Sequence, residues 1–208
     1  MPTSTFFHLP EAKRTKLLNA ARAEFSRVSY SDASINRIIH AADIPRGSFY
    51  MYFSDKGDLF RHLLEEYLQQ FSDLLSRLLS QRGGDPFAAF LDFFDLVQTH
   101  RCRDLAMEEM ISIFQRNAGL PDAAAMNYGG LASLFEPICS AMDASLLKIE
   151  RETDPQDMLH ILIGVTAPLI HRSLVSSDPE RERARYCNLL AILRRGMAKE
   201  PTPGISLS

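Results

Sequence analysis

The sequence predicts an all-α protein, and three observations support this prediction. Strand signals are nearly absent, because there is no long alternating run of β-branched residues and no Asn-Gly or Asp-Gly hairpin pair. Apolar residues recur instead at three- and four-residue steps, as in Leu17, Leu18, Ala21, Phe25 and Val28. Prolines stand at or just before the start of such patterns, where a missing N–H costs little: Pro10, Pro45, Pro86, Pro121, Pro155 and Pro179.

These marks predict about nine helices. The expected ranges are 10–29, 35–42, 46–52, 56–80, 86–99, 104–116, 122–149, 155–176 and 179–197. Asp85, Asp154 and Asp178 precede three of the prolines and are candidate N-caps. We expect three parts in the chain: a helix-turn-helix domain at 1–56, a larger helical domain at 57–198 and a flexible tail at 199–208.

Composition places the chain among soluble globular proteins. Of 208 residues, 46% are hydrophobic and 24% are charged, which excludes collagen-like, coiled-coil and disordered classes. Cys102, Cys139 and Cys187 are odd in number and widely spaced, so they predict reduced thiols rather than disulfides or zinc ligands. The N-terminus lacks the pattern of a signal peptide, and the most apolar stretch, 158–170, is shorter than a membrane span. We therefore expect a cytoplasmic protein without membrane contact.

The net charge of -3 is unevenly distributed along the chain. Residues 1–62 carry nine Lys and Arg against six Asp and Glu, whereas the remainder carries 14 basic and 20 acidic residues. The excess of positive charge at the N-terminal end indicates which part of the chain could meet a polyanion such as DNA.

Two short predicted helices near the N-terminus form a candidate helix-turn-helix, with residues 41–45 as the turn. Phe49 and Phe53 lie four residues apart and are expected to face inward. Outward residues of the second helix could bind phosphates and base edges: Arg46, Gly47, Ser48, Tyr50, Met51 and Tyr52. Ser34 is a candidate cap of the first short helix, and Ser54 and Asp55 of the helix in which Lys56 could neutralise a phosphate. A helical module that binds protein and not DNA is the alternative.

Residues 10–60 resemble the DNA-binding domain of TetR-family transcriptional regulators. The resemblance rests on the run Ser34 to Ile38, the run Ala41 to Phe53, and the run Lys56 to Phe60, which stand in that family's order and spacing. It implies that Ser34 touches a phosphate, that Arg46, Gly47, Ser48 and Met51 meet the major groove, and that Tyr50, Tyr52 and Lys56 hold the DNA backbone. Asp43 is a departure, since the family usually has glycine in this turn.

The resemblance also implies a homodimer that binds a palindromic operator in double-stranded DNA and is released by a small-molecule effector, most simply as a repressor. Central helices would line an effector cavity, for a partly apolar ligand, with Phe90, Phe93, Phe94, Met107, Met110, Ile111, Phe114, Met126 and Phe135; a packed core is the alternative. The last two helices would form the dimer interface with Leu162, Leu169, Ile170, Leu174, Leu189, Leu190 and Leu193, and an intrachain core is again the alternative.

No catalytic or metal-binding motif stands out in the sequence. Gly-x-Ser-x-Gly, His-Glu-x-x-His and phosphate-binding glycine loops are all missing. Asp157 and His160 have the spacing of one half of a di-metal site, but the other required pair does not occur. We therefore expect neither an enzyme nor a protein that uses a cofactor or metal ion.

Overall fold

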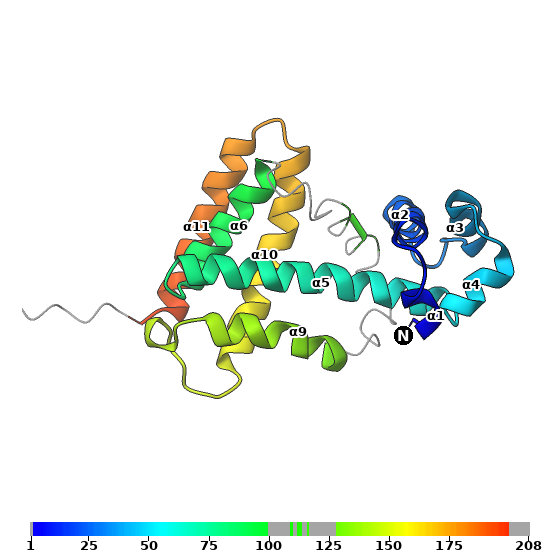
Figure 1. Ribbon diagram of the computed structural model, residues 1–208. Helices are drawn as coiled ribbons and strands as arrows, with labels where there is room; N and C mark the ends of the chain where they lie inside the picture. The colour runs from blue at the N-terminus through cyan, green and yellow to red at the C-terminus, as the bar shows by residue number, and fades with distance from the viewer. Residues whose placement is uncertain (1, 100–108, 110–111, 114–115, 117–127, 200–208) are drawn as a thin grey trace, which may run out of the picture. The chain divides into compact units, whose positions relative to one another are not determined.

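The computed structural model describes residues 2–99, 109, 112–113, 116 and 128–199 (Figure 1). The described residues form nine α-helices and no β-strand, which confirms the predicted fold class. The helices are α1 (Ser4–Phe7), α2 (Glu11–Arg27), α3 (Ile35–Ala42), α4 (Arg46–Tyr52), α5 (Lys56–Gln81), α6 (Pro86–Gln98), α9 (Tyr128–Ala141), α10 (Asp154–Val175) and α11 (Pro179–Met197). A short 3-10 helix, η2 (Ala144–Leu146), follows α9.

Most predicted helices have the expected bounds, but the one at 122–149 does not. Helix α9 ends at Ala141, because the backbone after it pairs with distant segments: Asp143 N–H donates to the Gly84 carbonyl at 3.0 Å, and Lys148 N–H donates to the Met197 carbonyl at 2.8 Å. The predicted helix at 104–116 falls mostly outside the described residues. Helix α1, of four residues, was not predicted at all.

The predicted caps are confirmed in two of three cases. Asp85 accepts the N–H groups of Phe87 and Ala88, and Asp178 accepts that of Arg181. The prediction for Asp154 was wrong, because Thr153 occupies the N-cap position and Asp154 is the first helical residue. The Asp154 carboxylate reaches backwards instead and accepts the N–H groups of Glu150 and Arg151.

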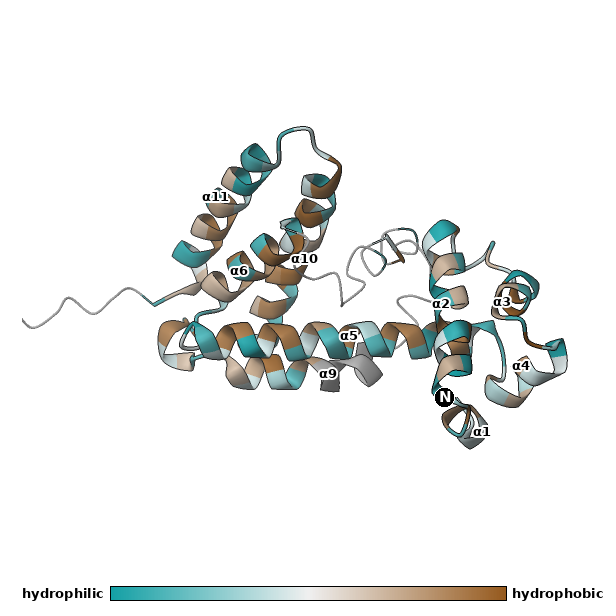
Figure 2. Cartoon of the chain, turned by 45° about the horizontal axis from the view of Figure 1, so that its top comes forward, coloured by the Kyte–Doolittle hydropathy of each residue, from teal (hydrophilic) through white to brown (hydrophobic). Residues whose placement is uncertain are grey.

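The chain divides into two compact units, each with its own apolar core. Among the described residues, the first comprises 2–71, 109, 112–113, 116 and 128–132, and the second comprises 72–99 and 133–199. Helix α5 supplies its first turns to one unit and its last turns to the other. Figure 2 shows that apolar and polar residues alternate along α5 in the manner of an amphipathic helix.

Three helices pack against one another in the second unit. Helices α6, α10 and α11 contact each other pairwise (Figure 1). The Phe94 ring stacks on the Tyr186 ring with 4.5 Å between centroids, and the Tyr186 hydroxyl lies 2.7 Å from Thr166 Oγ1. This contact joins one residue from each of the three helices, and all three side chains are buried.

Helix α10 is long and apolar enough to cross a membrane if judged by length and composition alone. It spans 22 residues, more than the apolar stretch apparent in the sequence. Its buried residues, among them Leu159, Leu162 and Ile170, pack within the second unit, where α10 contacts α6 and α11. A core helix of a globular unit passes the same test.

Candidate nucleic-acid interface

The turn between α3 and α4 has the geometry of a helix-turn-helix. Asp43 follows the last residue of α3 in the left-handed conformation, with φ 56° and ψ 49°. The Ile44 N–H donates to the Ile39 carbonyl at 3.0 Å, and the Asp43 N–H donates to the His40 carbonyl at 3.2 Å. These bonds close the C-terminus of α3 in the arrangement that usually places glycine at this position. Aspartate is one of the few other residues that adopt it.

Helix α4 presents its polar side to solvent, as predicted. Phe49 and Phe53 are fully buried, whereas Tyr50 is 46% and Met51 57% exposed. Arg46 is also exposed, and its guanidinium donates to the Asn36 side chain at 2.8 Å. Gly47 has open space where a Cβ would lie, so another backbone can approach it closely. The outward face therefore has donors and apolar groups within reach of a neighbouring molecule.

Helix α1 and the residue before it hold the end of α4 in place. The Thr3 N–H donates to the Tyr52 carbonyl at 3.0 Å, and the Thr3 hydroxyl donates to the Met51 carbonyl at 2.6 Å. Phe6 is buried with its ring 4.8 Å from that of Phe53. The first residues of the chain thus satisfy carbonyls that the C-terminus of a helix leaves without partners.

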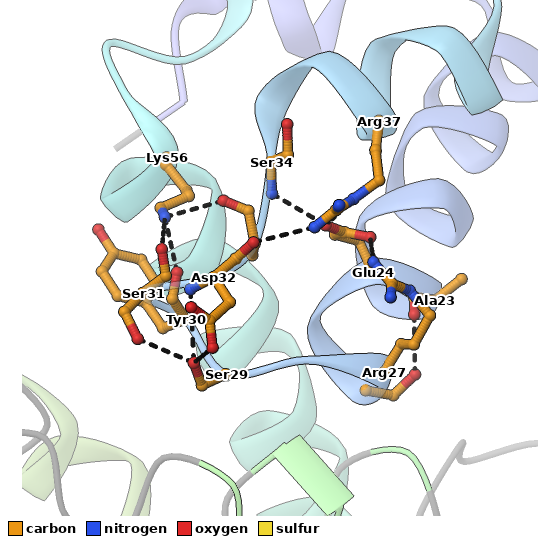
Figure 3. A network of polar contacts seen from close by, with 12 residues as sticks. Ala23, Glu24, Arg27, Ser29, Tyr30, Ser31, Asp32, Ser34, Arg37 and Lys56 are labelled. Carbon is orange, nitrogen blue, oxygen red and sulfur yellow. Dashed lines mark hydrogen bonds and ion pairs between the residues drawn. The ribbon is translucent and has the colours of Figure 1, made fainter.

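A buried carboxylate organises the segment between α2 and α3 (Figure 3). Glu24 is 5% exposed and accepts from Arg37 Nε and Arg27, each at 2.7 Å, and from the Ser34 N–H at 2.9 Å. Burial alone would raise the pKa of Glu24, but these donors outweigh it and hold the pKa below its ordinary value of 4.5. Glu24 therefore fixes the start of α3.

Ser34 occupies the N-cap position of α3 but does not cap it with its side chain. Its N–H is bound to Glu24, and its hydroxyl does not make the capping hydrogen bond that the sequence predicted. The phosphate contact of Ser34 stays a prediction.

Lys56 has a structural role that the sequence did not indicate. Its ammonium donates to the carbonyls of Tyr30 at 2.6 Å, Ala33 at 2.9 Å and Ser31 at 3.2 Å, and lies 4.6 Å from the centroid of the Tyr30 ring (Figure 3). Three carbonyls use the three donors of an ammonium group. Lys56 thus ties the start of α5 to the segment before α3. Asp55 caps α5 by accepting the Asp58 N–H at 2.7 Å, and Asp58 in turn accepts the Ser54 N–H.

The predicted effector residues are only partly described. Phe90, Phe93, Phe94 and Phe135 are buried in the core of the second unit. Met107, Met110, Ile111, Phe114 and Met126 lie outside the described residues. A pocket of about 450 Å³ lies beside Arg172, Arg181 and Arg185, and one of about 200 Å³ lies in the first unit; neither is lined by these phenylalanines.

The predicted dimer residues fall into two groups. Leu162, Leu169, Ile170 and Leu190 are buried within the chain's own second unit, while Leu174, Leu189 and Leu193 are not fully buried. The large apolar residues that α10 and α11 leave exposed are others: Ile161 at 45%, Val175 at 70% and Ile192 at 54%. In the described part of the chain, no group of three His, Cys, Asp or Glu residues could hold a metal ion.

Comparisons with known proteins agree with the geometry of the first unit. Residues 17–63 match the family described as bacterial regulatory proteins, tetR family. The chain is 34% identical over 70 residues to the uncharacterized HTH-type transcriptional regulator YdgC of Bacillus subtilis, covering 34% of this chain and 36% of that protein. It is 30% identical over 104 residues to the HTH-type transcriptional regulator AcrR of Shigella flexneri, covering 47% of this chain and 48% of that protein.

The chain thus matches less than half the length of these relatives. A solved structure extends the likeness of fold: SmeT, the repressor of the Stenotrophomonas maltophilia multidrug efflux pump SmeDEF, has a TM-score of 0.59 at 18% identity, covering 95% of this chain and 98% of that one. The fold similarity therefore reaches beyond the helix-turn-helix.

Proposed function

We propose that this chain, which belongs to the tetR family of bacterial regulatory proteins by its N-terminal domain, is a cytoplasmic transcriptional repressor that binds a palindromic operator as a homodimer and leaves it when a small molecule binds. One observation carries the DNA-binding part of the proposal. Helix α4 has a buried Phe49–Phe53 side and an exposed side with Arg46, Tyr50 and Met51, directly after a helix-turn-helix turn.

Such a helix enters the major groove, where its side chains reach base edges while flanking donors bind phosphates. The two helix-turn-helix domains of a symmetric dimer would contact half-sites about 34 to 36 Å apart. We propose repression over activation because a protein that occupies a promoter blocks it without any further partner. Relatives named as regulators, and not enzymes, favour this class over catalysis.

The homodimer is proposed to form through the outer surface of α10 and α11. Ile161, Val175 and Ile192 are large apolar side chains that remain exposed on these two helices. Exposed apolar residues on neighbouring helices favour burial against a second copy. The effector is proposed to bind the second unit beside Phe90, Phe93, Phe94 and Phe135. The other five effector residues predicted from the sequence lie outside the described residues.

DNA binding is tested by an electrophoretic mobility shift with the DNA upstream of the chain's own gene. We expect a shift that weakens steeply as salt rises. Tyr50→Ala should weaken binding, because it removes an exposed side chain from the face of α4 that is proposed to contact DNA. The buried core should stay undisturbed. Arg77→Ala, an exposed change on the distal part of α5, is the matched control. A helical module that binds only protein would give no salt-dependent shift with any promoter fragment.

The dimer is tested by sedimentation of Ile161→Arg and Ile192→Arg variants. Each places a charge on the proposed surface and should shift the chain toward monomer, with weaker operator binding as a consequence. The control is Ile149→Arg, at a half-buried position on the segment before α10. It lies outside the proposed surface and should leave the assembly unchanged. Sedimentation of both variants as dimers would remove this surface from the proposal.

A further inference from the structure

A pocket of about 200 Å³ opens beside the helix-turn-helix turn within the first unit. Its walls come from the first half of α2, the turn between α3 and α4, and α4 itself. Lys13, Lys16, Asp43, Ser48 and Tyr52 supply its polar groups. Ser48 and Tyr52 also belong to the candidate nucleic-acid interface, so the pocket continues that surface onto α2.

The floor of the pocket is apolar. Leu17 and Ala42 are buried, and Leu9, Ile44 and Pro45 complete the lining. A site with an apolar floor and cationic groups at its edge suits a ligand with a carbon ring beside an anionic group. A deoxyribose with its phosphate has this composition.

The two lysines supply the charge. Both are exposed on α2, three residues apart, so their ammonium groups can converge on one anion. The Lys13 side chain makes no ion pair or hydrogen bond among the described residues. Lys16 lies 3.5 Å from the Asp43 carboxylate, with side chains 52% and 89% exposed. An exposed pair of this kind is weak and leaves Lys16 able to turn toward another anion.

We infer that this pocket is a phosphate site for the DNA backbone, in which Lys13 and Lys16 neutralise one phosphate. The Ser48 and Tyr52 hydroxyls donate to the phosphate, and the apolar floor receives the adjoining sugar. The inference rests on the proposed DNA-binding function, because the backbone must pass along α4 to reach the pocket. It also gives Lys16 a second task, which is to offset the negative charge that Asp43 brings close to DNA.

Salt dependence of DNA binding tests the inference, with the promoter duplex and a duplex of unrelated sequence as probes. The slope of log Kobs against log salt concentration should become shallower by about 0.9 for each phosphate that a variant leaves without its cation, and by about twice that in a dimer. The Lys13→Ala, Lys16→Ala double variant leaves the phosphate without a cation and should reduce the slope by this amount on both probes, since phosphate contacts carry no sequence information. Each single variant should reduce the slope by less. Arg77→Ala should leave it unchanged. An unchanged slope for the Lys13→Ala, Lys16→Ala double variant would overturn the inference.

Asp43→Asn separates the two tasks of Lys16, because asparagine keeps the left-handed conformation and removes the charge. If Lys16 binds phosphate, Lys16→Ala must flatten the slope in the Asp43→Asn background as well. If it acts only on Asp43, Lys16→Ala has no effect there, which contradicts the inference. Circular dichroism of each variant verifies that the protein is folded.

A third arm uses inorganic phosphate. The contradicting outcome has two parts. Phosphate protects the wild-type protein from thermal unfolding but does not protect the Lys13→Ala, Lys16→Ala double variant, and the slope of DNA binding is the same for the wild-type protein and the double variant. That result would mean a free-anion site and would overturn the assignment to DNA. Failure of the proposed function looks different, because the wild-type protein would then bind neither duplex in a salt-dependent way.

Discussion

Glu24 on α2 and Arg37 on α3 form an ion pair with 2.7 Å between the carboxylate oxygen and Nε, and the carboxylate is almost entirely buried. The same carboxylate receives the Ser34 N–H, and Arg37 also donates to the Asp32 carbonyl at 2.9 Å. The segment from 28 to 34 is thus held largely by polar contacts, with Lys56 on its other side. A buried charge needs several donors to offset its desolvation, so removal of any one should be felt.

Glu24→Gln should lower the free energy of unfolding by about 1 to 3 kcal/mol, because charge-assisted hydrogen bonds to Arg27 and Arg37 become neutral ones. Urea denaturation followed by helical circular dichroism measures this. Glu11→Gln, an exposed change in the first turn of the same helix, is the control and should alter stability little. Equal stability of both variants would mean that the Glu24 carboxylate does not contribute to the stability of the first unit.

The pH dependence of stability should carry a contribution from His62. Burial lowers the pKa of this imidazole below 6.5 and outweighs the opposing effect of Glu66, Glu65 and Asp58. Its ring packs 5.3 Å from that of Phe6, which favours the neutral form. The unfolded chain therefore binds the proton more readily, so stability should fall as pH drops below about 6.5, by at most about 1.4 kcal/mol per pH unit.

His62→Phe should remove this part of the pH dependence between pH 7 and 5 in urea denaturation, while His40→Gln, at an exposed position of α3, should retain it. An unchanged profile for His62→Phe would show that other groups titrate in this range.

Local signals predicted much of the fold. The bounds of α3, α4 and α11 agree with the sequence because their apolar periodicity and their prolines act within a few residues. The buried pair Phe49 and Phe53 was predicted for the same reason. The end of α9 was not, because Asp143 and Lys148 bond to Gly84 and Met197, which are distant in sequence. A helical pattern carries no information on such pairings.

In the candidate site, too, local spacing was predictable from the sequence and contacts between distant residues were not. The outward residues of α4 followed from a four-residue spacing, whereas the role of Lys56 depends on carbonyls more than 20 residues away. Glu24, Lys13 and Lys16 were not singled out, since nothing in a charged residue on a helix indicates which partner it meets after folding. Asp43 stands where the family usually has glycine, and its backbone nevertheless adopts a positive φ.

Gly84 should tolerate no side chain, in contrast to its neighbour Gly83. Both have positive φ, at 77° and 61°, so alanine is strained at either position by about 1 kcal/mol. A Cβ at Gly84 would also lie 2.6 Å from the Asp143 backbone nitrogen, whereas one at Gly83 would meet nothing within 4 Å. Gly84→Ala should therefore cost clearly more than Gly83→Ala in thermal denaturation. Equal effects would mean that backbone conformation alone requires glycine in this loop.

Tyr186→Phe isolates the polar part of the contact among α6, α10 and α11. The Tyr186 hydroxyl lies 2.7 Å from Thr166 Oγ1 and 3.3 Å from the Phe90 carbonyl oxygen. Thr166 keeps its own bond to the Leu162 carbonyl at 2.6 Å, so only one buried acceptor is left without its donor and the cost should be about 1 to 2 kcal/mol. Tyr186→Ala also removes the ring that stacks on Phe94 and should cost about 3 to 5 kcal/mol.

Chemical denaturation of both Tyr186 variants beside Tyr50→Phe, whose ring is exposed, gives the comparison. Tyr50→Phe should leave the free energy of unfolding almost unchanged, because its hydroxyl is hydrated in the folded and unfolded states alike. Destabilisation of equal size by Tyr186→Phe and Tyr186→Ala would place the whole contribution in the hydroxyl and contradict a packed aromatic contact at this position.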